Sequence, residues 1–298
     1  MNILALQLAL IALAAGGPTA ENPLFQELIT KGIKMSDGTR IKLPPPILAD
    51  GLDAAGQHAA LSKVADARSS VKDLLAKSYY APVVVKVRTV KPSEGEGPAV
   101  RAVDLWFTVH GDWNTLTSRE FLESIVKPAD EGPSRVVAKS GFLNDHELAA
   151  KKLSAVVKEG HEERFVYSTF SLFERVEISA TRFAVLTRDK SAVLAAGRVD
   201  PRFAKDPDYP NQWRPLVRNE RAEIERGPAH PWSSGGGYAK ITRLVKPADA
   251  VLVECHIVYE EPYGWFDGAN LVKQKGPLIV LEKVRVFRRK LATAGAQK

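Results

Sequence analysis

The sequence predicts an α+β fold: mainly one antiparallel sheet of about eight strands, with one long N-terminal helix and two shorter helices. Short β-branched runs with alternating polarity dominate the chain after residue 83. Several of these runs follow one another too closely for parallel crossovers, which need a dozen or more residues. The pattern lacks the regular alternation of strand and helix that indicates a doubly wound sheet.

The N-terminus is typical of a secretory signal peptide. Residues 1–13 are almost wholly apolar, a Gly-Gly-Pro break follows at 16–18, and small residues lead to Ala20. The run is too short to cross a bilayer, which takes about 20 apolar residues, and its small-residue exit resembles a cleavage site. We predict a signal peptide over residues 1–20, with cleavage after Ala14 and a buried N-terminal helix as the alternatives.

The remainder of the chain is expected to divide into an arm and a domain. Residues 21–50 predict an N-terminal arm with a short hairpin, turning at Ser-Asp-Gly 36–38, and a Pro-rich linker. Residues 51–298 predict a single α+β domain, or two sub-lobes that meet near residues 130–160.

The composition limits where the protein can be located and what it can bind. The lone cysteine, Cys255, has no partner for a disulfide, and no long apolar stretch follows the leader. The net charge is +7, but Lys and Arg are scattered among 35 acidic residues. We therefore expect a soluble periplasmic or extracellular protein without a transmembrane segment. It would not bind nucleic acid, and its partner would be an envelope component or another exported protein.

Residues 53–78 carry the strongest helical pattern. Their apolar side chains recur at helical spacing, Asp53 is a candidate N-cap, and Pro82 ends the segment. The two shorter helices are expected at 118–126 and around 146–157.

The eight expected strands are short segments in which β-branched and aromatic residues recur. They are 83–90, 99–110, 163–170, 174–188, 192–199, 238–245, 250–260 and 277–288. Residues 200–236 are rich in Pro, Arg and Gly, and we expect them to be mostly irregular.

Four residues are candidates for catalysis. Glu254 and His256 stand two apart on an expected strand, so both side chains leave the same face and the carboxylate can orient the imidazole. His110 and Asp112 end another strand at a glycine, where acid–base pairs often gather. Structural hydrogen bonding of these groups is the alternative. The histidines share no metal-ligand spacing, and short catalytic motifs are missing, so we predict neither a metal site nor a cofactor.

Aromatic side chains crowd into two irregular stretches and are candidates for ligand binding. Tyr263, Trp265 and Phe266 lie in the loop 261–270, and Trp213 lies in a second such stretch. Exposed rings bind sugars, peptides or protein surfaces, since they supply a large contact area at low entropic cost. The alternative is a loop that folds back, so that the rings plug the end of the sheet.

These observations predict an exported, non-enzymatic binding or scaffold domain that uses its aromatic loops. One alternative is a hydrolase with a dispersed site, which requires His110 and His256 to lie within about one water of a shared cleft. A second alternative is a periplasmic carrier of an apolar ligand, enclosed between a curved sheet and the helix 53–78.

Overall fold

The computed structural model describes residues 21–65, 69–92, 95, 97–118, 140–221, 223–267 and 269–296. The predicted signal peptide and nearly all of the helix expected at 118–126 lie outside these ranges.

Within the described ranges, twelve strands form one sheet, and every pair of neighbours in it is antiparallel. The long strands, in spatial order, are β3 (Val83–Lys91), β4 (Ala99–His110), β14 (Ala250–Glu261), β13 (Gly235–Arg243), β9 (Ala192–Val199), β8 (Val176–Arg188) and β7 (His161–Leu172). Five short strands extend the edges: β5 (Ser140–Phe142), β6 (Val157–Lys158), β10 (Gln212–Arg218), β11 (Ile224–Arg226) and β12 (His230–Pro231).

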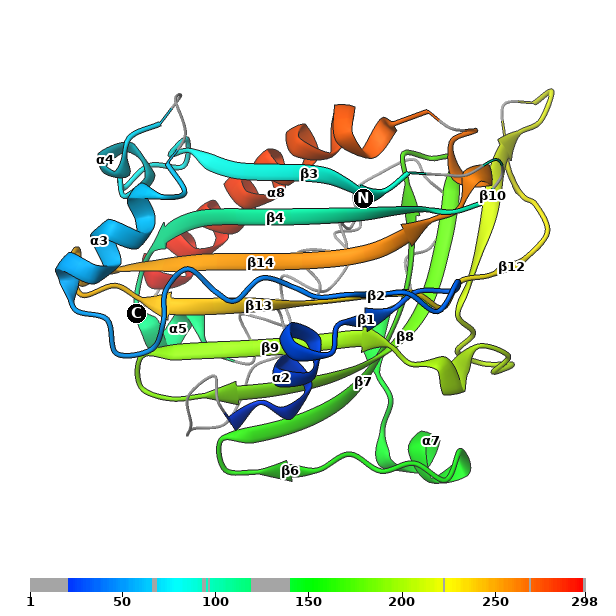
Figure 1. Cartoon of the computed structure of the whole chain (residues 1–298), viewed down its shortest axis with the longest axis horizontal. Helices are drawn as coiled ribbons and strands as arrows, with labels where there is room; N and C mark the ends of the chain where they lie inside the picture. The colour runs from blue at the N-terminus through cyan, green and yellow to red at the C-terminus, as the bar shows by residue number, and fades with distance from the viewer. Residues whose placement is uncertain are drawn as a thin grey trace.

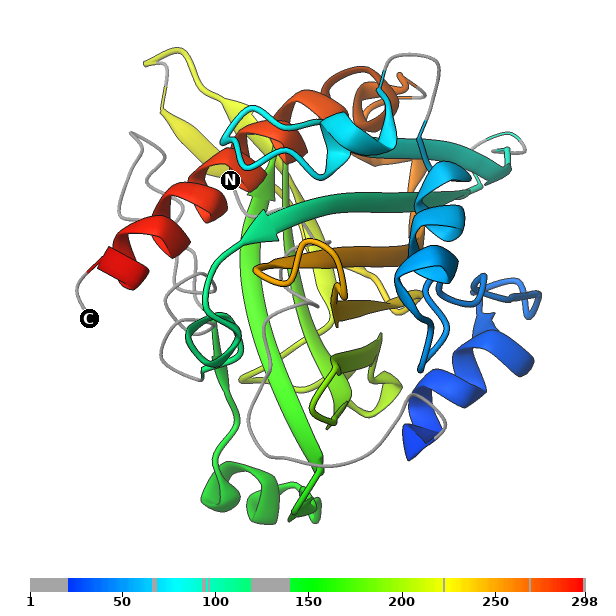
Figure 2. The same cartoon turned by 90° about the vertical axis from the view of Figure 1, so that its left-hand side faces the viewer.

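The sheet curves, and α8 (Leu271–Ala296) crosses its concave side (Figure 2). Strand β8 contributes to this shape because it changes partner along its length. Residues 182–188 pair with β9, whereas residues 176–179 pair with β10. The largest apolar core lies between the concave face and α8.

The N-terminal segment, residues 21–65 and 69–75, covers the convex face (Figure 1). Its elements are α2 (Pro23–Thr30), the hairpin strands β1 (Ile33–Lys34) and β2 (Arg40–Ile41), α3 (Ala54–Ser62) and α4 (Val71–Leu74). Phe25 packs edge-on against Tyr238 of β13, with ring centroids 4.9 Å apart. Both faces of the sheet are therefore buried, although an antiparallel sheet can leave one face in water.

Polar contacts hold the N-terminal segment on the convex face as well as apolar packing does. They join Asn22 to the carbonyl of Val185 (2.9 Å), Ser36 to Glu260 (2.8 Å), the amide of Ile47 to Glu254 (3.0 Å), and Lys240 to the carbonyl of Leu48 (2.6 Å). The convex face thus carries charged side chains because this segment provides their partners.

The prediction of one long N-terminal helix over residues 53–78 is wrong. Asp53 is the predicted N-cap, accepting from the amide of Gly56 at 2.8 Å, but α3 ends at Ser62. A new helix then begins after Ser70, which forms a reciprocal capping box with Asp73. Ser70 favours a helix start over a helix interior, because its hydroxyl competes for backbone amides.

The expected number of strands and the strand at 277–288 are also wrong. That segment lies inside α8, and its β-branched content obscured a helical stripe. The stripe is Val280, Val284, Phe287 and Leu291, spaced four, three and four residues apart and buried against the sheet. Five of the sheet's strands are short pieces of two to seven residues, three of them within the expected irregular region 200–236.

Short helices complete the chain. They are α5 (Trp113–Leu116), α7 (Asp145–Ala150), and the 3-10 turns η2 (Pro201–Phe203) and η3 (Tyr263–Trp265). The helix expected around 146–157 corresponds to α7. It begins one residue earlier than expected, at Asp145, and already ends at Ala150. No helix in the described part of the chain combines the length and the apolar character that crossing a bilayer requires.

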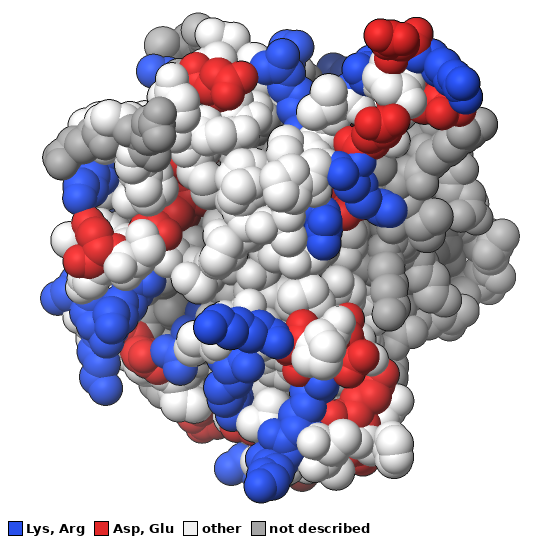
Figure 3. Space-filling view, turned by 90° about the vertical axis from the view of Figure 1, so that its right-hand side faces the viewer, with Lys and Arg blue, Asp and Glu red and all other residues white. Residues whose placement is uncertain are grey.

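Charge is mixed over the face shown in Figure 3, where Lys and Arg side chains stand beside Asp and Glu around an uncharged middle. Among the described residues, ion pairs include Lys151 with Asp206 at 2.5 Å and Arg226 with Glu177 at 3.0 Å. On this face the positive charges are spread among acidic neighbours.

Candidate functional site

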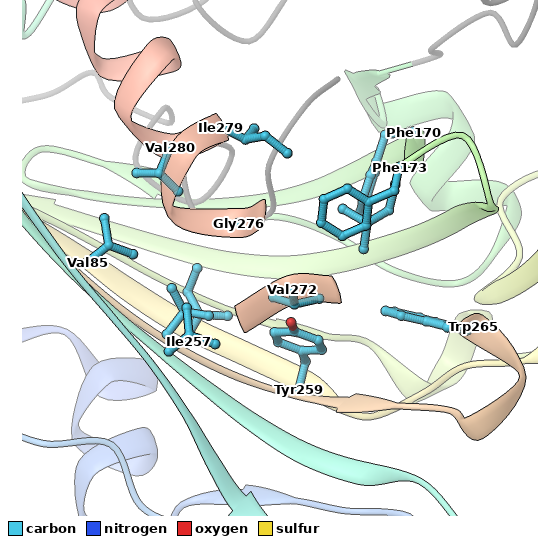
Figure 4. Close-up of a pocket in the computed structure, with 13 residues that line it drawn as sticks. Val85, Phe170, Phe173, Ile257, Tyr259, Trp265, Val272, Gly276, Ile279 and Val280 are labelled. Atoms are coloured by element: carbon cyan, nitrogen blue, oxygen red, sulfur yellow. The ribbon is translucent and has the colours of Figure 1, made fainter. Parts of the chain in front are cut away.

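An apolar cavity lies between the concave face of the sheet and the first turns of α8 (Figure 4). Its sheet wall includes Val85 of β3 and Ile257 and Tyr259 of β14, and Phe170 of β7 lies across from them. Trp265 of η3 closes one end. The lining is almost entirely carbon, which suits an apolar ligand.

The cavity is narrow. The space between its lining atoms is about 590 Å³, part of it open to solvent, but a water-sized sphere can be centred in only about 50 Å³ of it. Pockets for drug-sized ligands usually enclose about 300–1,000 Å³. The shape is therefore a slit that admits a slim chain, or a larger molecule if α8 moves outward.

Helix α8 presents one face to the cavity through Val272, Gly276, Ile279 and Val280. At 1.5 Å per residue, this face is about 12 Å long. Gly276 leaves room there, because a Cβ at this position would meet only Cγ1 of Val272, at 3.6 Å. The next residue, Pro277, lacks the N–H that would bond the preceding turn, so the first turns of α8 are held less firmly than the rest.

Beyond Tyr259 the same face becomes polar. Arg101 of β4 is paired in register with Tyr259, and its guanidinium contacts Glu261 at 2.5 Å and the hydroxyl of Thr89. Arg101 and Glu261 are 7% and 6% exposed, so this ion pair is buried. Burial raises the pKa of Tyr259 and the charge of Glu261 raises it further, while Arg101 opposes them.

Three buried polar atoms at this end of the cavity have no hydrogen-bond partner among the described residues. They are Nε of Arg101, Oε2 of Glu261 and Nε1 of Trp265. Trp265 is 2% exposed, and its ring lies parallel to that of Tyr259 at 6.3 Å. Buried polar groups without partners are rare in folded proteins and call for an explanation.

These polar residues were not among the sequence candidates, although the sequence contains a signal for two of them. Arg101 shares its strand parity with Val103 and Leu105, and Glu261 shares its parity with Ile257 and Tyr259. A charge in line with buried apolar positions indicates either a buried ion pair or a site. The parity of neighbouring strands does not reveal which charges meet.

The candidate aromatic residues are mostly buried. Trp265 and Phe266 are each 2% exposed, Trp213 is 8% exposed and stacks on His230 at 4.5 Å, and Tyr263 is 39% exposed. Trp213, Trp265 and Phe266 belong to the main core, so three of the four rings are core residues. Of these, Trp265 lines the cavity.

His256 and Glu254 lie on the convex face, beneath the N-terminal segment. The ring nitrogens of His256 meet Asp104 at 2.7 Å and Glu254 at 2.8 Å, so both carry hydrogens. Burial lowers the pKa of His256, but the hydrogen bonds to the two carboxylates outweigh it and the net shift is upward. Arg88 neutralises Asp104 at 2.7 Å. This cluster is fully hydrogen-bonded and buried, as expected of structural groups.

His110 and Asp112 lie apart from that cluster. His110 contacts the carbonyl of Leu75 at 3.1 Å, and Asp112 caps α5 by accepting from the amide of Thr115 at 2.7 Å. Along β4, His110 is six residues from the partner of His256 in β14, which corresponds to about 20 Å. The four catalytic candidates therefore share no cleft. The described residues hold no cluster of three or more His, Cys, Asp or Glu that could bind a metal ion.

No family model matches the chain, and no curated protein matches it. The crystal structure of human STARD10 is similar over 84% of this chain and 86% of that one, with 10% identity and a TM-score of 0.39. An uncharacterized protein from Rhizobium leguminosarum is similar over 65% of this chain and 98% of that one, with 8% identity and a TM-score of 0.31. With both TM-scores below 0.5, neither likeness bears on the function of this chain.

Proposed function

We propose that this chain binds an apolar ligand in the cavity between α8 and the concave face of the sheet, without catalysing a reaction on it. The observation that carries the proposal is the almost entirely apolar, largely buried slit lined by both layers. It corresponds to the apolar carrier considered above, with α8 in place of the expected helix 53–78. The signal peptide predicted at residues 1–20 is part of the proposal, and it directs the protein to the periplasm or outside the cell.

The energetics favour an apolar occupant. Each square ångström of apolar ligand surface removed from water contributes about 25 cal/mol to the free energy of binding. The lining has few polar groups that would lose hydrogen bonds to water when the ligand enters. Because the slit is narrow, loading a ligand requires the first turns of α8 to shift. Gly276 and Pro277 make this the section of the helix with the lowest cost of movement.

Two substitutions at one position test the proposal. Gly276→Leu places a side chain in the cavity, whereas Gly276→Ala adds only a methyl group, for which space exists. Binding is measured by the fluorescence of N-phenylnaphthylamine, an apolar probe that brightens when it leaves water, and circular dichroism verifies the fold of each variant.

We expect wild type and Gly276→Ala to bind the probe with similar affinity. Gly276→Leu should bind at least about tenfold more weakly, since it fills the site. Equal binding by folded Gly276→Leu and wild type would place the probe elsewhere and refute the proposal.

A further inference from the structure

We infer that the ligand is an amphiphile with one slim aliphatic chain and a small neutral head, a hydroxyl in the simplest case, which is recognised by Arg101, Glu261 and Trp265. This inference rests on the proposed function, because it assigns the polar end of the same cavity. It adds the chemical class of the head group and the residues that select it.

The polar residues continue the wall of the cavity. Val87 and Val103 line the cavity and are paired in register, and the next pair along the same face is Thr89 with Arg101. Arg101 is also paired in register with Tyr259, whose hydroxyl points toward α8 across the cavity (Figure 4). A chain lying along the apolar wall therefore ends at the Arg101–Glu261 pair.

The unpartnered atoms define what the head must offer. Arg101 Nε and Trp265 Nε1 are N–H donors, and Glu261 Oε2 is an acceptor. A hydroxyl has two acceptor lone pairs and one O–H donor. Its two acceptor sites and one donor therefore match in number the two donors and one acceptor that are unused beside this end of the cavity.

Charge excludes an ionised head. The guanidinium of Arg101 is balanced by the carboxylate of Glu261 at 2.5 Å, so the pair is neutral as a unit. A fatty-acid carboxylate only accepts hydrogen bonds, so it would leave Glu261 Oε2 without a donor and lie close to its negative charge. Repulsion between like charges is costly in a site from which water is excluded. A head without polar atoms would leave all three groups unsatisfied.

Three ligands with the same chain test the inference, namely decane, decanol and decanoate. Each ligand is titrated into a complex of N-phenylnaphthylamine with the protein after removal of the predicted signal peptide, and displacement of the probe is measured. The pH is near neutral, where decanoate is ionised. We expect decanol to bind more tightly than decane by about two- to tenfold for each hydrogen bond gained. It should also bind about tenfold or more tightly than decanoate.

Trp265→Phe keeps the aromatic ring and removes the donor. It should reduce the preference for decanol over decane by about two- to tenfold. The matched control is Trp232→Phe: the Trp232 ring lies 5.8 Å from that of Trp265, but its N–H already donates to the carbonyl of Glu260 at 2.9 Å. This control should leave the ratio of the two affinities unchanged.

Glu261→Gln removes the negative charge at nearly constant shape and leaves Arg101 uncompensated. The order of affinities should then reverse, with decanoate bound more tightly than decanol. If Glu261→Gln does not fold, Trp265→Phe by itself still decides the question, since it removes the indole donor and leaves the Arg101–Glu261 pair intact.

The results separate failure of this inference from failure of the proposed function. Equal affinities for the three ligands, all abolished in Gly276→Leu, would overturn the head-group inference and leave the apolar site standing. The same outcome would show that water, and not a ligand, satisfies the three polar atoms. No displacement by any ligand, together with normal probe binding by Gly276→Leu, would refute the proposed function itself.

Discussion

The indole nitrogen of Trp232 donates a hydrogen bond of 2.9 Å to the carbonyl of Glu260, whereas the indole nitrogen of Trp265, in a ring 5.8 Å away, has no partner among the described residues. Both side chains are buried, at 3% and 2% exposed. The two neighbouring tryptophans therefore differ in their hydrogen bonding. Trp232 satisfies the backbone, and Trp265 keeps a donor available beside the cavity.

This difference predicts unequal effects of the same substitution on the stability of the ligand-free protein. Trp232→Phe breaks a buried hydrogen bond and should lower the free energy of unfolding by about 1–3 kcal/mol. Trp265→Phe removes the same ring volume but breaks no hydrogen bond, so it should cost less than Trp232→Phe. Urea denaturation followed by circular dichroism measures both values. A loss for Trp265→Phe as large as that for Trp232→Phe would show that its N–H is partnered after all.

The convex face predicts a pH dependence centred on His256. Its pKa is raised in the folded state, because the hydrogen bonds and charges of Asp104 and Glu254 outweigh burial. The resulting stabilisation is fully present below the unfolded pKa of about 6.5, and it is lost as pH rises through the folded pKa. Lys240, Tyr238 and Arg88 also face this region, and burial raises the pKa of the Tyr238 hydroxyl.

His256→Gln should therefore flatten the decline of the free energy of unfolding that begins above the unfolded pKa of about 6.5. Urea denaturation at several pH values tests this. His146→Gln, an exposed control on α7, should keep the wild-type slope. An unchanged slope in His256→Gln would assign the pH dependence to other groups.

Lys240 predicts how the N-terminal segment is attached. Its side chain is completely buried, and its ammonium donates to the carbonyl of Leu48 at 2.6 Å and to Asp50 at 2.7 Å. Lys240→Met leaves these groups without the ammonium and should lower the free energy of unfolding by about 1–3 kcal/mol. Hydrogen exchange should accelerate most in residues 47–62. Lys246→Met, at an exposed position, serves as the control, and uniform acceleration across the sheet would contradict a local attachment.

The helical state of α8 predicts which of its side chains carry stability. Phe287 is 5% exposed and packs edge-on against Phe107 at 6.0 Å, whereas Leu278 is 68% exposed. Phe287→Ala should cost about 3–5 kcal/mol, and Leu278→Ala should stay within about 0.5 kcal/mol. Thermal denaturation distinguishes them. Similar costs for both would be inconsistent with the packing of α8 on the concave face.

The longest strands were predictable from the sequence, because alternation and β-branched content are local properties. Residues 99–110 and 192–199 form β4 and β9 within the expected bounds. Segment 277–288 was not predictable in this way. Its β-branched residues favour a strand, but the segment packs as a helix on the concave face of the sheet, and burial of Val284 and Phe287 outweighs local propensity.

The candidate site, like the fold, was predictable from the sequence only in part. The sequence by itself determined which side chains share a face, and so it singled out Glu254 with His256 and identified Trp265 as unusual. Only the tertiary structure decided that His256 is enclosed by the N-terminal segment, that Arg101 pairs with Glu261, and that Trp265 lines a cavity. The reason is physical: parity along a strand depends on the chain itself, whereas burial and hydrogen-bond partners depend on segments more than a hundred residues away.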